Sequence, residues 1–271
     1  MEKEYQKHAE VIRKNIVRMV TSAQSGHPGG ALSGVDLLTV LYFKEMNITK
    51  ENGNTTKRDR FVLSKGHASA LLYAVLAEKG LLEEEKLLTF RHTGSPLQGH
   101  PNMNYVTGVD MSTGSLGQGL SCAVGMALAN RLDQSQDRVY VMMGDGEVQE
   151  GQIWEAAMAA AHYKLDNLCG ILDNNGLQID GEIEKVMNPD PLDKKFEAFG
   201  WHVIHIDGHD YEAIEKAYHE ARETKGKPTL ILAKTVKGKG VSFMENQAGW
   251  HGTAPSEQQC EQAIQELGGK K

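Results

Sequence analysis

The sequence is poor in the features that mark secreted, membrane or disulfide-stabilised proteins. Of its 271 residues only three are cysteines, Cys122, Cys169 and Cys260, and their number and wide spacing fit neither a disulfide framework nor a metal site. No apolar run is long enough to span a bilayer, and the charged start MEKEYQKHAE differs from a signal peptide. We therefore expect a cytoplasmic protein with reduced thiols and no membrane partner.

Excess positive charge is also lacking. The net charge is -7 and no cluster of lysine or arginine reverses it locally, which argues against nucleic acid as a partner. A composition of 40% hydrophobic and 24% charged residues is ordinary for a globular protein. Because no repeat or low-complexity linker interrupts the chain, we expect a single domain over residues 1–271.

The pattern of apolar residues predicts an α/β fold. Short apolar runs predict strands at 58–63, 138–143, 168–172, 201–206 and 229–233. Helical spacing predicts helices at 5–25, 36–46, 70–79, 120–131, 150–163 and 211–224. This order favours one parallel central sheet with helices on both faces.

Polar oxygen ligands follow two of these strands. Asp145 lies in Gly-Asp-Gly after one strand, and Asn175 follows the next strand along the chain. Carboxylate, amide and backbone carbonyl oxygens suit Mg²⁺ or Ca²⁺, which keep positions open for phosphate oxygens. Gly146 allows a diphosphate to approach the backbone, and the following helix N-terminus favours its charge. The residues from Asp145 to Asn175 therefore predict a site at which a divalent metal bridges the protein and a diphosphate.

Two other phosphate loops do not fit this stretch. The dinucleotide fingerprint requires glycine where Gln149 stands, and the P-loop requires Lys-Ser or Lys-Thr where Gln152-Ile153 stand. The thiamine diphosphate motif, Gly-Asp-Gly followed about thirty residues later by two asparagines, does fit. An ordinary turn with Asp145 as a helix N-cap is the alternative.

Histidines beside glycines in loops form a second pattern. A single loop histidine is usually just solvated, but four in this setting indicate an active-site rim that binds phosphate or hydroxyls and moves protons. They are His27, His67, His100 and His251. A zinc site at His202, His205 and His209 is not expected, because the first two point to opposite faces of a strand.

Seven motifs, in order, resemble the N-terminal, diphosphate-binding half of the transketolases. They are GHPGG at Gly26, SKGHAS at Ser64, GHP at Gly99, TGSLGQG at Thr113, GDGEVQEG at Gly144, DNNGLQIDG at Asp173 and WHG at Trp250. Together they span nearly the whole chain. Ser115 replaces a proline found in some members, a minor difference if the backbone does the binding.

The resemblance implies a role for each matching residue. The metal would be bound by Asp145, the Asn175 side chain and the Leu177 carbonyl. The cofactor, thiamine diphosphate, would contact His67, Gly114, Ser115, Leu116, Gly146, Glu147, Asn175, Ile179 and His251. Catalytic proton transfer and hydroxyl binding would fall to His27, His100 and His251. Glu147 and Glu150 would repel a diphosphate unless they point away, and Glu150 and Glu155 match acidic residues at a subunit boundary.

The resemblance also implies an activity. Transketolases transfer a two-carbon glycolaldehyde unit from a ketose phosphate to an aldose, using thiamine diphosphate with Mg²⁺ or Ca²⁺. Full-length members continue into pyrimidine-binding and C-terminal domains that this chain lacks. We therefore expect one half of a split transketolase, which would work with a separate C-terminal subunit in an α2β2 assembly. The alternatives are another thiamine diphosphate activity, such as a 1-deoxyxylulose phosphate synthase or a 2-oxo acid enzyme, or a non-catalytic regulatory subunit.

Overall fold

The computed structural model describes residues 2–268 and has the expected parallel sheet at its centre. Five parallel strands lie in the order β1-β2-β3-β7-β6. Their bounds are β1 Arg60–Leu63, β2 Val139–Gly144, β3 Leu168–Asn174, β6 His202–Asp207 and β7 Thr229–Lys234. The α/β class is confirmed, and the strands begin or end within two residues of their predicted positions.

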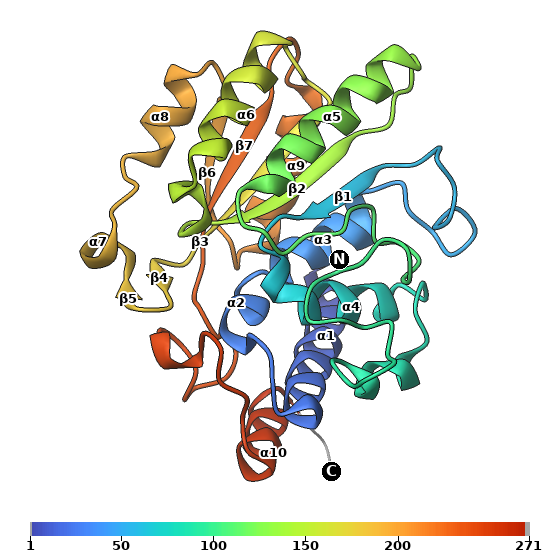
Figure 1. Cartoon of the computed structure of the whole chain (residues 1–271), viewed down its shortest axis with the longest axis vertical. Helices are drawn as coiled ribbons and strands as arrows, with labels where there is room; N and C mark the ends of the chain where they lie inside the picture. Colours follow the sequence, from blue (N-terminus) through green and yellow to red (C-terminus); the bar gives the residue numbers. More distant parts are fainter. Residues whose placement is uncertain (1, 269–271) are drawn as a thin grey trace.

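Helices cover the sheet on both faces, as predicted. The first face carries a core to which six helices contribute, namely α1 Glu2–Ala23, α2 Pro28–Ser33, α3 Val35–Val40, α4 Ser69–Glu78, α9 Tyr211–Glu223 and α10 Glu257–Glu266. The second face is covered by α5 Gln118–Leu132, α6 Gly151–His162 and α8 Leu192–Ala198, which Figure 1 shows side by side. Alternate residues of each central strand enter the two cores, as the pleat of a buried strand requires.

The structure differs from the sequence prediction at several elements. The glycines of Gly26–Gly30 predict a break after the first helix, yet Pro28–Ser33 forms the helix α2, with Pro28 in its first turn. The helix predicted at 36–46 continues from α3 into a π-helical turn at Leu41–Glu45. The short α7 Ile183–Val186, the longer α8 and α10, and a two-stranded hairpin of β4 Leu177–Gln178 and β5 Gly181–Glu182 were not predicted.

The motifs that begin at Ser64, Gly144, Asp173 and Trp250 lie in the loops that follow the carboxyl ends of β1, β2, β3 and β7. This arrangement follows from the parallel sheet, in which all strands end at one edge and loops there can meet. Residues 92–110, which are rich in glycine, proline and asparagine, form a loop without helix or strand. Among residues 2–268, no helix is both long and apolar enough to cross a membrane. The sequence also predicts a frayed tail at 268–271, and residues 269–271 lie outside the described residues.

Candidate functional site

A cavity of about 370 Å³ opens where the loops after β1, β2, β3 and β7 meet α2 and the β4–β5 hairpin. Most residues predicted from the sequence line it. These are His27, His67, Gly114, Leu116, Asp145, Gly146, Glu147, Glu150, Asn175, Leu177, Ile179 and His251. Segments as far apart in the sequence as those of His27 and His251 therefore form one site.

The predicted metal ligands converge at the ends of β2 and β3. Asp145 is almost fully buried, and its carboxylate accepts hydrogen bonds from the backbone N–H of Gly146 at 2.9 Å and of Gly176 at 2.5 Å. The Asn175 amide oxygen accepts the N–H of Leu177 at 3.1 Å. Burial and the nearby charge of Asp173 raise the pKa of Asp145 to about 6. A divalent cation beside Asp145 would offset this unfavourable burial of negative charge.

A buried polar network supports these ligands from below. Asp173 is fully buried and pairs with the ammonium of Lys65, which also donates to the Gly30 carbonyl at 2.7 Å. The hydroxyls of Ser33 and Thr235 donate to the same carboxylate. Although burial opposes it, the Lys65 charge and these hydrogen bonds lower the pKa of Asp173. The network ties α2 and the ends of β1, β3 and β7 together, and its members Gly30, Lys65 and Asp173 also line the cavity.

Three of the four loop histidines form a compact cluster. The ring centroids of His27, His67 and His251 lie 5.1 to 5.5 Å apart. Burial, with help from neighbouring positive groups, lowers the pKa of His27 to about 4 and of His251 to about 3, and that of His67 well below its usual value. At neutral pH each ring is uncharged and offers one donor and one acceptor nitrogen.

The fourth loop histidine, His100, lies at the side of this cluster. It packs against Gly114, where a Cβ atom would lie 2.8 Å from the imidazole ring. Gly114 has φ +141, so both its backbone conformation and the contact exclude a side chain. Burial and the charge of Arg91 lower the pKa of His100.

The Glu147 side chain is held by hydrogen bonds from the protein itself. Its carboxylate is buried and accepts hydrogen bonds from the Ser64 hydroxyl, from the Gly117 N–H at 3.0 Å and from the Gly144 N–H at 3.1 Å. The side chain therefore binds three protein segments, although the residue lines the cavity. These hydrogen bonds explain how a glutamate can lie near a diphosphate, and the cofactor contact predicted for Glu147 stays a prediction.

Three cations at or near the cavity were not predicted, namely Lys65, described above, Lys237 and Arg91. Lys237 is 2% exposed and lines the cavity, with its ammonium 3.0 Å from the Leu177 carbonyl oxygen and 2.8 Å from Nδ1 of His251. Burial lowers its pKa to about 8, against the attraction of Asp145 and Asp173. Arg91 lies near His27 and His100, and its Nε has no partner within residues 2–268. The only available signal was the glycine-rich context of Lys237, TVKGKG.

Other predicted residues lie at the rim or outside the cavity. Leu116 and Ile179 are 37% and 68% exposed at its edge. Ser115 and Glu155 are exposed and are not among the lining residues, and Glu150 is the exposed N-cap of α6. The roles predicted for these residues therefore remain predictions.

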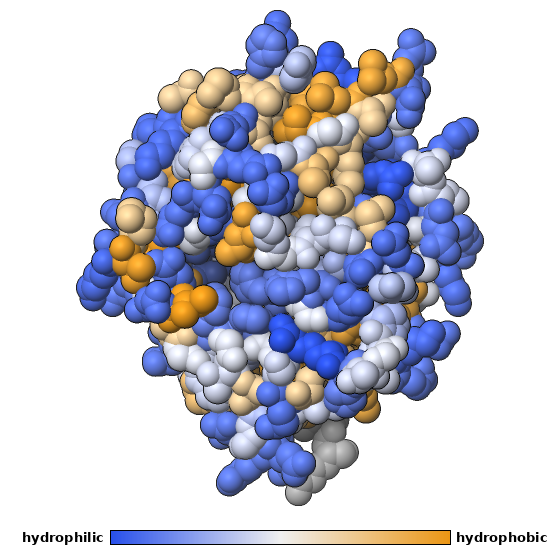
Figure 2. Space-filling model, in the orientation of Figure 1, coloured by the Kyte–Doolittle hydropathy of each residue, from blue (hydrophilic) through white to orange (hydrophobic). Residues whose placement is uncertain are grey.

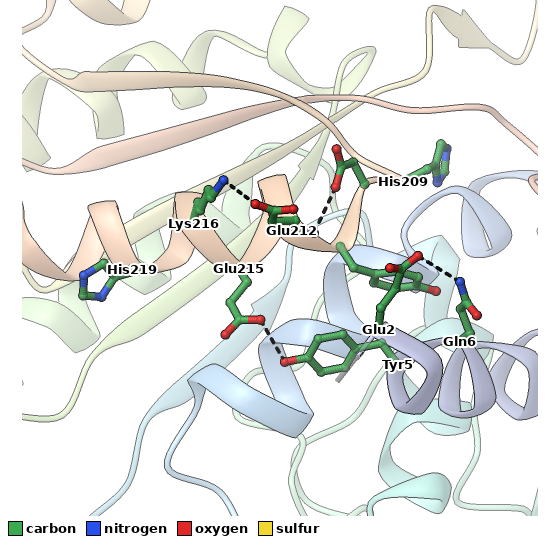
Figure 3. A pocket seen from close by; sticks show the side chains of 10 residues that line it. Glu2, Tyr5, Gln6, His209, Glu212, Glu215, Lys216 and His219 are labelled. Carbon is green, nitrogen blue, oxygen red and sulfur yellow. Dashed lines mark hydrogen bonds and ion pairs between the residues drawn. The ribbon is translucent and has the colours of Figure 1, made fainter.

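A larger cavity lies elsewhere and shares no residue with this site. It has a volume of about 850 Å³ and lies between the start of α1 and α9, lined by Glu2, Tyr5, His209 and acidic residues of α9 (Figure 3). Several of its side chains are already paired, such as Tyr5 with Glu215 at 3.2 Å. As expected, His202, His205 and His209 do not converge, since their rings pair with Glu220, Asp193 and Asp36 respectively. No group of residues able to hold a metal through three His, Cys, Asp or Glu side chains occurs within 2–268.

The fold and the smaller cavity define a diphosphate-binding α/β domain that uses a divalent metal. The chain belongs to the transketolase family, because the model of the transketolase thiamine diphosphate binding domain matches residues 4–271. It is 45% identical over 259 residues to one of the subunits of the apulose-4-phosphate transketolase of Phocaeicola vulgatus, covering 96% of this chain and 92% of that protein. It is equally identical over 262 residues to a 6-deoxy-6-sulfo-D-fructose transketolase subunit of a Clostridium species, covering 97% and 95%.

Single-chain transketolases match over only part of their length. Human transketolase is 44% identical over 96% of this chain, which spans 41% of the human protein. The solved structure of transketolase from Leishmania mexicana superposes with a TM-score of 0.91 at 34% identity, covering 97% of this chain and 41% of that one. The recognition of an N-terminal transketolase half from the sequence is confirmed.

The residues present fit thiamine diphosphate with a divalent metal, the cofactor of this family. The donor set of Asp145, Asn175 and the Leu177 carbonyl is all oxygen, as Mg²⁺ and Ca²⁺ require. Buried polar atoms at the cavity, Nδ1 of His27 and Nε2 of Gln178, have no partner in the described part of the chain and are available to a ligand.

Proposed function

We propose that this chain, together with a partner subunit, transfers a two-carbon ketol unit from a ketose phosphate to an aldose acceptor. One observation carries the proposal: the oxygen ligands, Lys237 and three uncharged histidines line one cavity at the carboxyl edge of the sheet. The enzyme class comes from the family, whose members of similar length are transketolase subunits.

The residues of this chain have different roles in the proposed reaction, according to where they lie in the cavity. When bound, thiamine diphosphate supplies the nucleophilic carbon and the capacity to hold the transferred unit. Asp145, Asn175 and the Leu177 carbonyl would hold the metal, and Gly146 gives the diphosphate access to the backbone. Lys237 would balance the diphosphate charge. His27, His100 and His251, uncharged near pH 7, would bind substrate hydroxyls and exchange protons with them.

A partner subunit would complete the site. Since this chain spans 41% of human transketolase, the rest of such an enzyme must pack on a surface of this chain. The exposed faces of α5 and α6 include large apolar side chains, with Met158 56% and Leu132 84% exposed, and Figure 2 shows apolar residues gathered over these helices. We infer that this α5–α6 face binds the partner, with the exposed Leu116 and Ile179 continuing it at the cavity rim, in an α2β2 assembly.

The proposal also covers the sugar donor, the pathway, the metal and the cellular compartment. The relatives named for apulose-4-phosphate and for 6-deoxy-6-sulfo-D-fructose show that split members differ in their sugar. We propose a ketose bearing a terminal anion as donor, in the pentose phosphate route or a more specialised carbohydrate pathway, with Mg²⁺ or Ca²⁺, in the cytoplasm.

The test is a two-carbon transfer assay with the co-purified native partner. The complex, supplied with thiamine diphosphate, Mg²⁺, a panel of phosphorylated and sulfonated ketoses and an aldose, should form the lengthened sugar, whereas the chain alone should not. The complex carrying Asp145→Ala should assemble normally and be inactive. Strong transfer by the isolated chain, or full activity of the Asp145→Ala complex, would contradict the proposal.

A further inference from the structure

A cluster of buried polar residues lies behind the cavity and contacts the backbone near Lys237. Its centre is Asp36 of α3, which is 3% exposed. The carboxylate accepts hydrogen bonds from both terminal nitrogens of Arg13, at 3.0 and 2.6 Å, and from the hydroxyl of Tyr211 at 2.6 Å. Nδ1 of His209 lies 2.8 Å from the same carboxylate. The Asp36 carboxylate therefore contacts hydrogen-bonding side chains of α1, of α9 and of the loop after β6.

The contacts of His209 fix its tautomer. Asp36 has no proton to give, because the charge of Arg13 and several hydrogen bonds overcome the effect of burial and lower its pKa. Nδ1 of His209 must therefore carry the proton. Nε2 lies 2.9 Å from the backbone nitrogen of Val236, which is always a donor, so Nε2 must accept. The imidazole thus joins the Asp36 carboxylate to the Val236 amide.

The same cluster holds the backbone on the other side of Lys237. Nε of Arg13 donates to the Lys239 carbonyl at 3.3 Å. Val236 and Lys239 bracket Lys237, whose stem packs closely on α2, since a Cβ atom at Gly29 would lie 3.1 Å from Cγ of Lys237. The Gly238 N–H also donates to the Gly29 carbonyl at 3.0 Å. The direction of the Lys237 side chain is therefore set by backbone contacts outside the cavity.

We propose that His209 is a positioning residue for cofactor binding: it holds the Val236 amide so that the Lys237 ammonium points at the diphosphate and metal. The inference rests on the proposed function. His209 itself does not reach the cavity, and Figure 3 shows it at the edge of the separate groove between α1 and α9. It acts only through Val236 and Lys237. Outer-shell partners of this kind typically change ligand affinity by about 10- to 100-fold.

The first test concerns the clamp, by which we mean the link from the Asp36 carboxylate through His209 to the Val236 amide. It needs no cofactor. Nitrogen NMR of the histidine side chains in the unmodified chain should show His209 as a neutral ring with its proton on Nδ1. The Val236 amide should exchange slowly with solvent. A proton on Nε2 of His209 would overturn the proposal, because that nitrogen could not then accept from Val236.

The second test is a double-mutant cycle on the complex of this chain with its partner, with thiamine diphosphate and Mg²⁺ as the probe. His209→Leu should raise the Kd of the cofactor by about 10- to 100-fold. In the Lys237→Met background the same change should alter the Kd by no more than about twofold. His209→Gln, whose amide can donate to Asp36 and accept from Val236, should restore most of the affinity.

The outcomes separate the two proposals. If His209→Leu weakens binding equally with and without Lys237, or if His209→Gln fails to restore affinity, the positioning role is wrong while the proposed function stands. If the unmodified complex binds no thiamine diphosphate, the proposed function fails and the cofactor role of His209 fails with it. The NMR measurement still decides whether the clamp exists.

Discussion

The carboxylate of Asp145 accepts the backbone N–H of Gly176 at 2.5 Å, which joins the loop after β2 to the loop after β3. The neighbouring residue Asn175 and the Leu177 carbonyl lie on that second loop. The oxygen ligands are thus held together by the protein's own hydrogen bonds. A metal that binds such a preorganised site does not have to order two loops, so more of its interaction energy is available for affinity.

Replacing Asp145 tests this arrangement. Asp145→Asn removes the negative charge and leaves the shape, so we expect metal and cofactor to lose their stabilising effect. For the unmodified chain or complex, ligand at 100 times its Kd should stabilise by about 2.7 kcal/mol. Thermal unfolding with and without thiamine diphosphate and Mg²⁺ measures this difference. Asp133→Asn, at the exposed end of α5, is the control and should keep the full shift. An equal shift in both variants would remove Asp145 as a ligand.

The Lys65–Asp173 pair predicts a large effect on stability. Both side chains are almost fully buried, so Lys65→Met leaves the charge of Asp173 without its partner. We expect the free energy of unfolding to fall by about 3–5 kcal/mol, measured by urea denaturation. Lys194→Met breaks an exposed pair with Glu197 on α8 and should cost less than about 1 kcal/mol. A loss no larger than that of the control would show that the buried pair is not needed.

The strands and the metal ligands could be predicted from the sequence because their signals are local. A buried strand is a short apolar run, and the parallel order brings Asp145 and Asn175 to one edge whatever the other contacts are. The loop histidines were predicted as a set, and three of them do meet. These features need only the neighbouring residues and the fold class.

The cations and the direction of Glu147 could not be predicted, because they depend on distant partners. Lys65 and Asp173 are 108 residues apart, and Glu147 and Ser64 are 83 apart. Nothing near Lys237 in the sequence indicates that it meets the Leu177 carbonyl. The helix α2 was missed for a similar reason. Its glycines disfavour a helix locally, but at Gly29 a Cβ atom would lie 2.9 Å from the Trp250 carbonyl oxygen and 3.1 Å from Cγ of Lys237.

His27 predicts how stability depends on pH. Its pKa is about 4 in the folded chain, mainly through burial, and about 6.5 when unfolded. Between these values the unfolded state binds more protons, so stability falls as the pH falls from 6.5 towards 4. His27→Gln removes this contribution and should flatten the slope by up to about 1.4 kcal/mol per pH unit. Urea denaturation between pH 4 and 8 measures it. The two proteins should show the same slope above pH 7.5, and an equally steep slope below 6.5 would contradict the prediction.

Two glycines in α5 predict opposite effects of one substitution. A Cβ atom at Gly119 would lie 2.7 Å from Cα of Ser64, so Gly119→Ala should destabilise the fold by about 1–3 kcal/mol. A Cβ atom at Gly125 meets no described atom within 4 Å, so Gly125→Ala should stabilise the isolated chain by about 0.5–1 kcal/mol. Denaturation midpoints of the two variants measure the contrast. The same sign for both would show that packing against Ser64 does not control α5.

The proposed partner surface predicts where a charge interferes with assembly. Met158 lies on α6 with 56% of its surface exposed, and Leu88, in the helical turn at Glu84–Thr89, is 53% exposed. Met158→Glu places a charge on the α5–α6 face. Because a docked subunit would remove water from this charge, the change should weaken partner binding tenfold or more, equivalent to about 1.4 kcal/mol. Leu88→Glu adds the same charge to the α1 side of the molecule and should not affect binding. Calorimetric titration with the partner subunit, with denaturation of each isolated variant to confirm folding, measures both. If Leu88→Glu rather than Met158→Glu weakens the complex, the partner binds the α1 side and the α5–α6 face is not its docking surface.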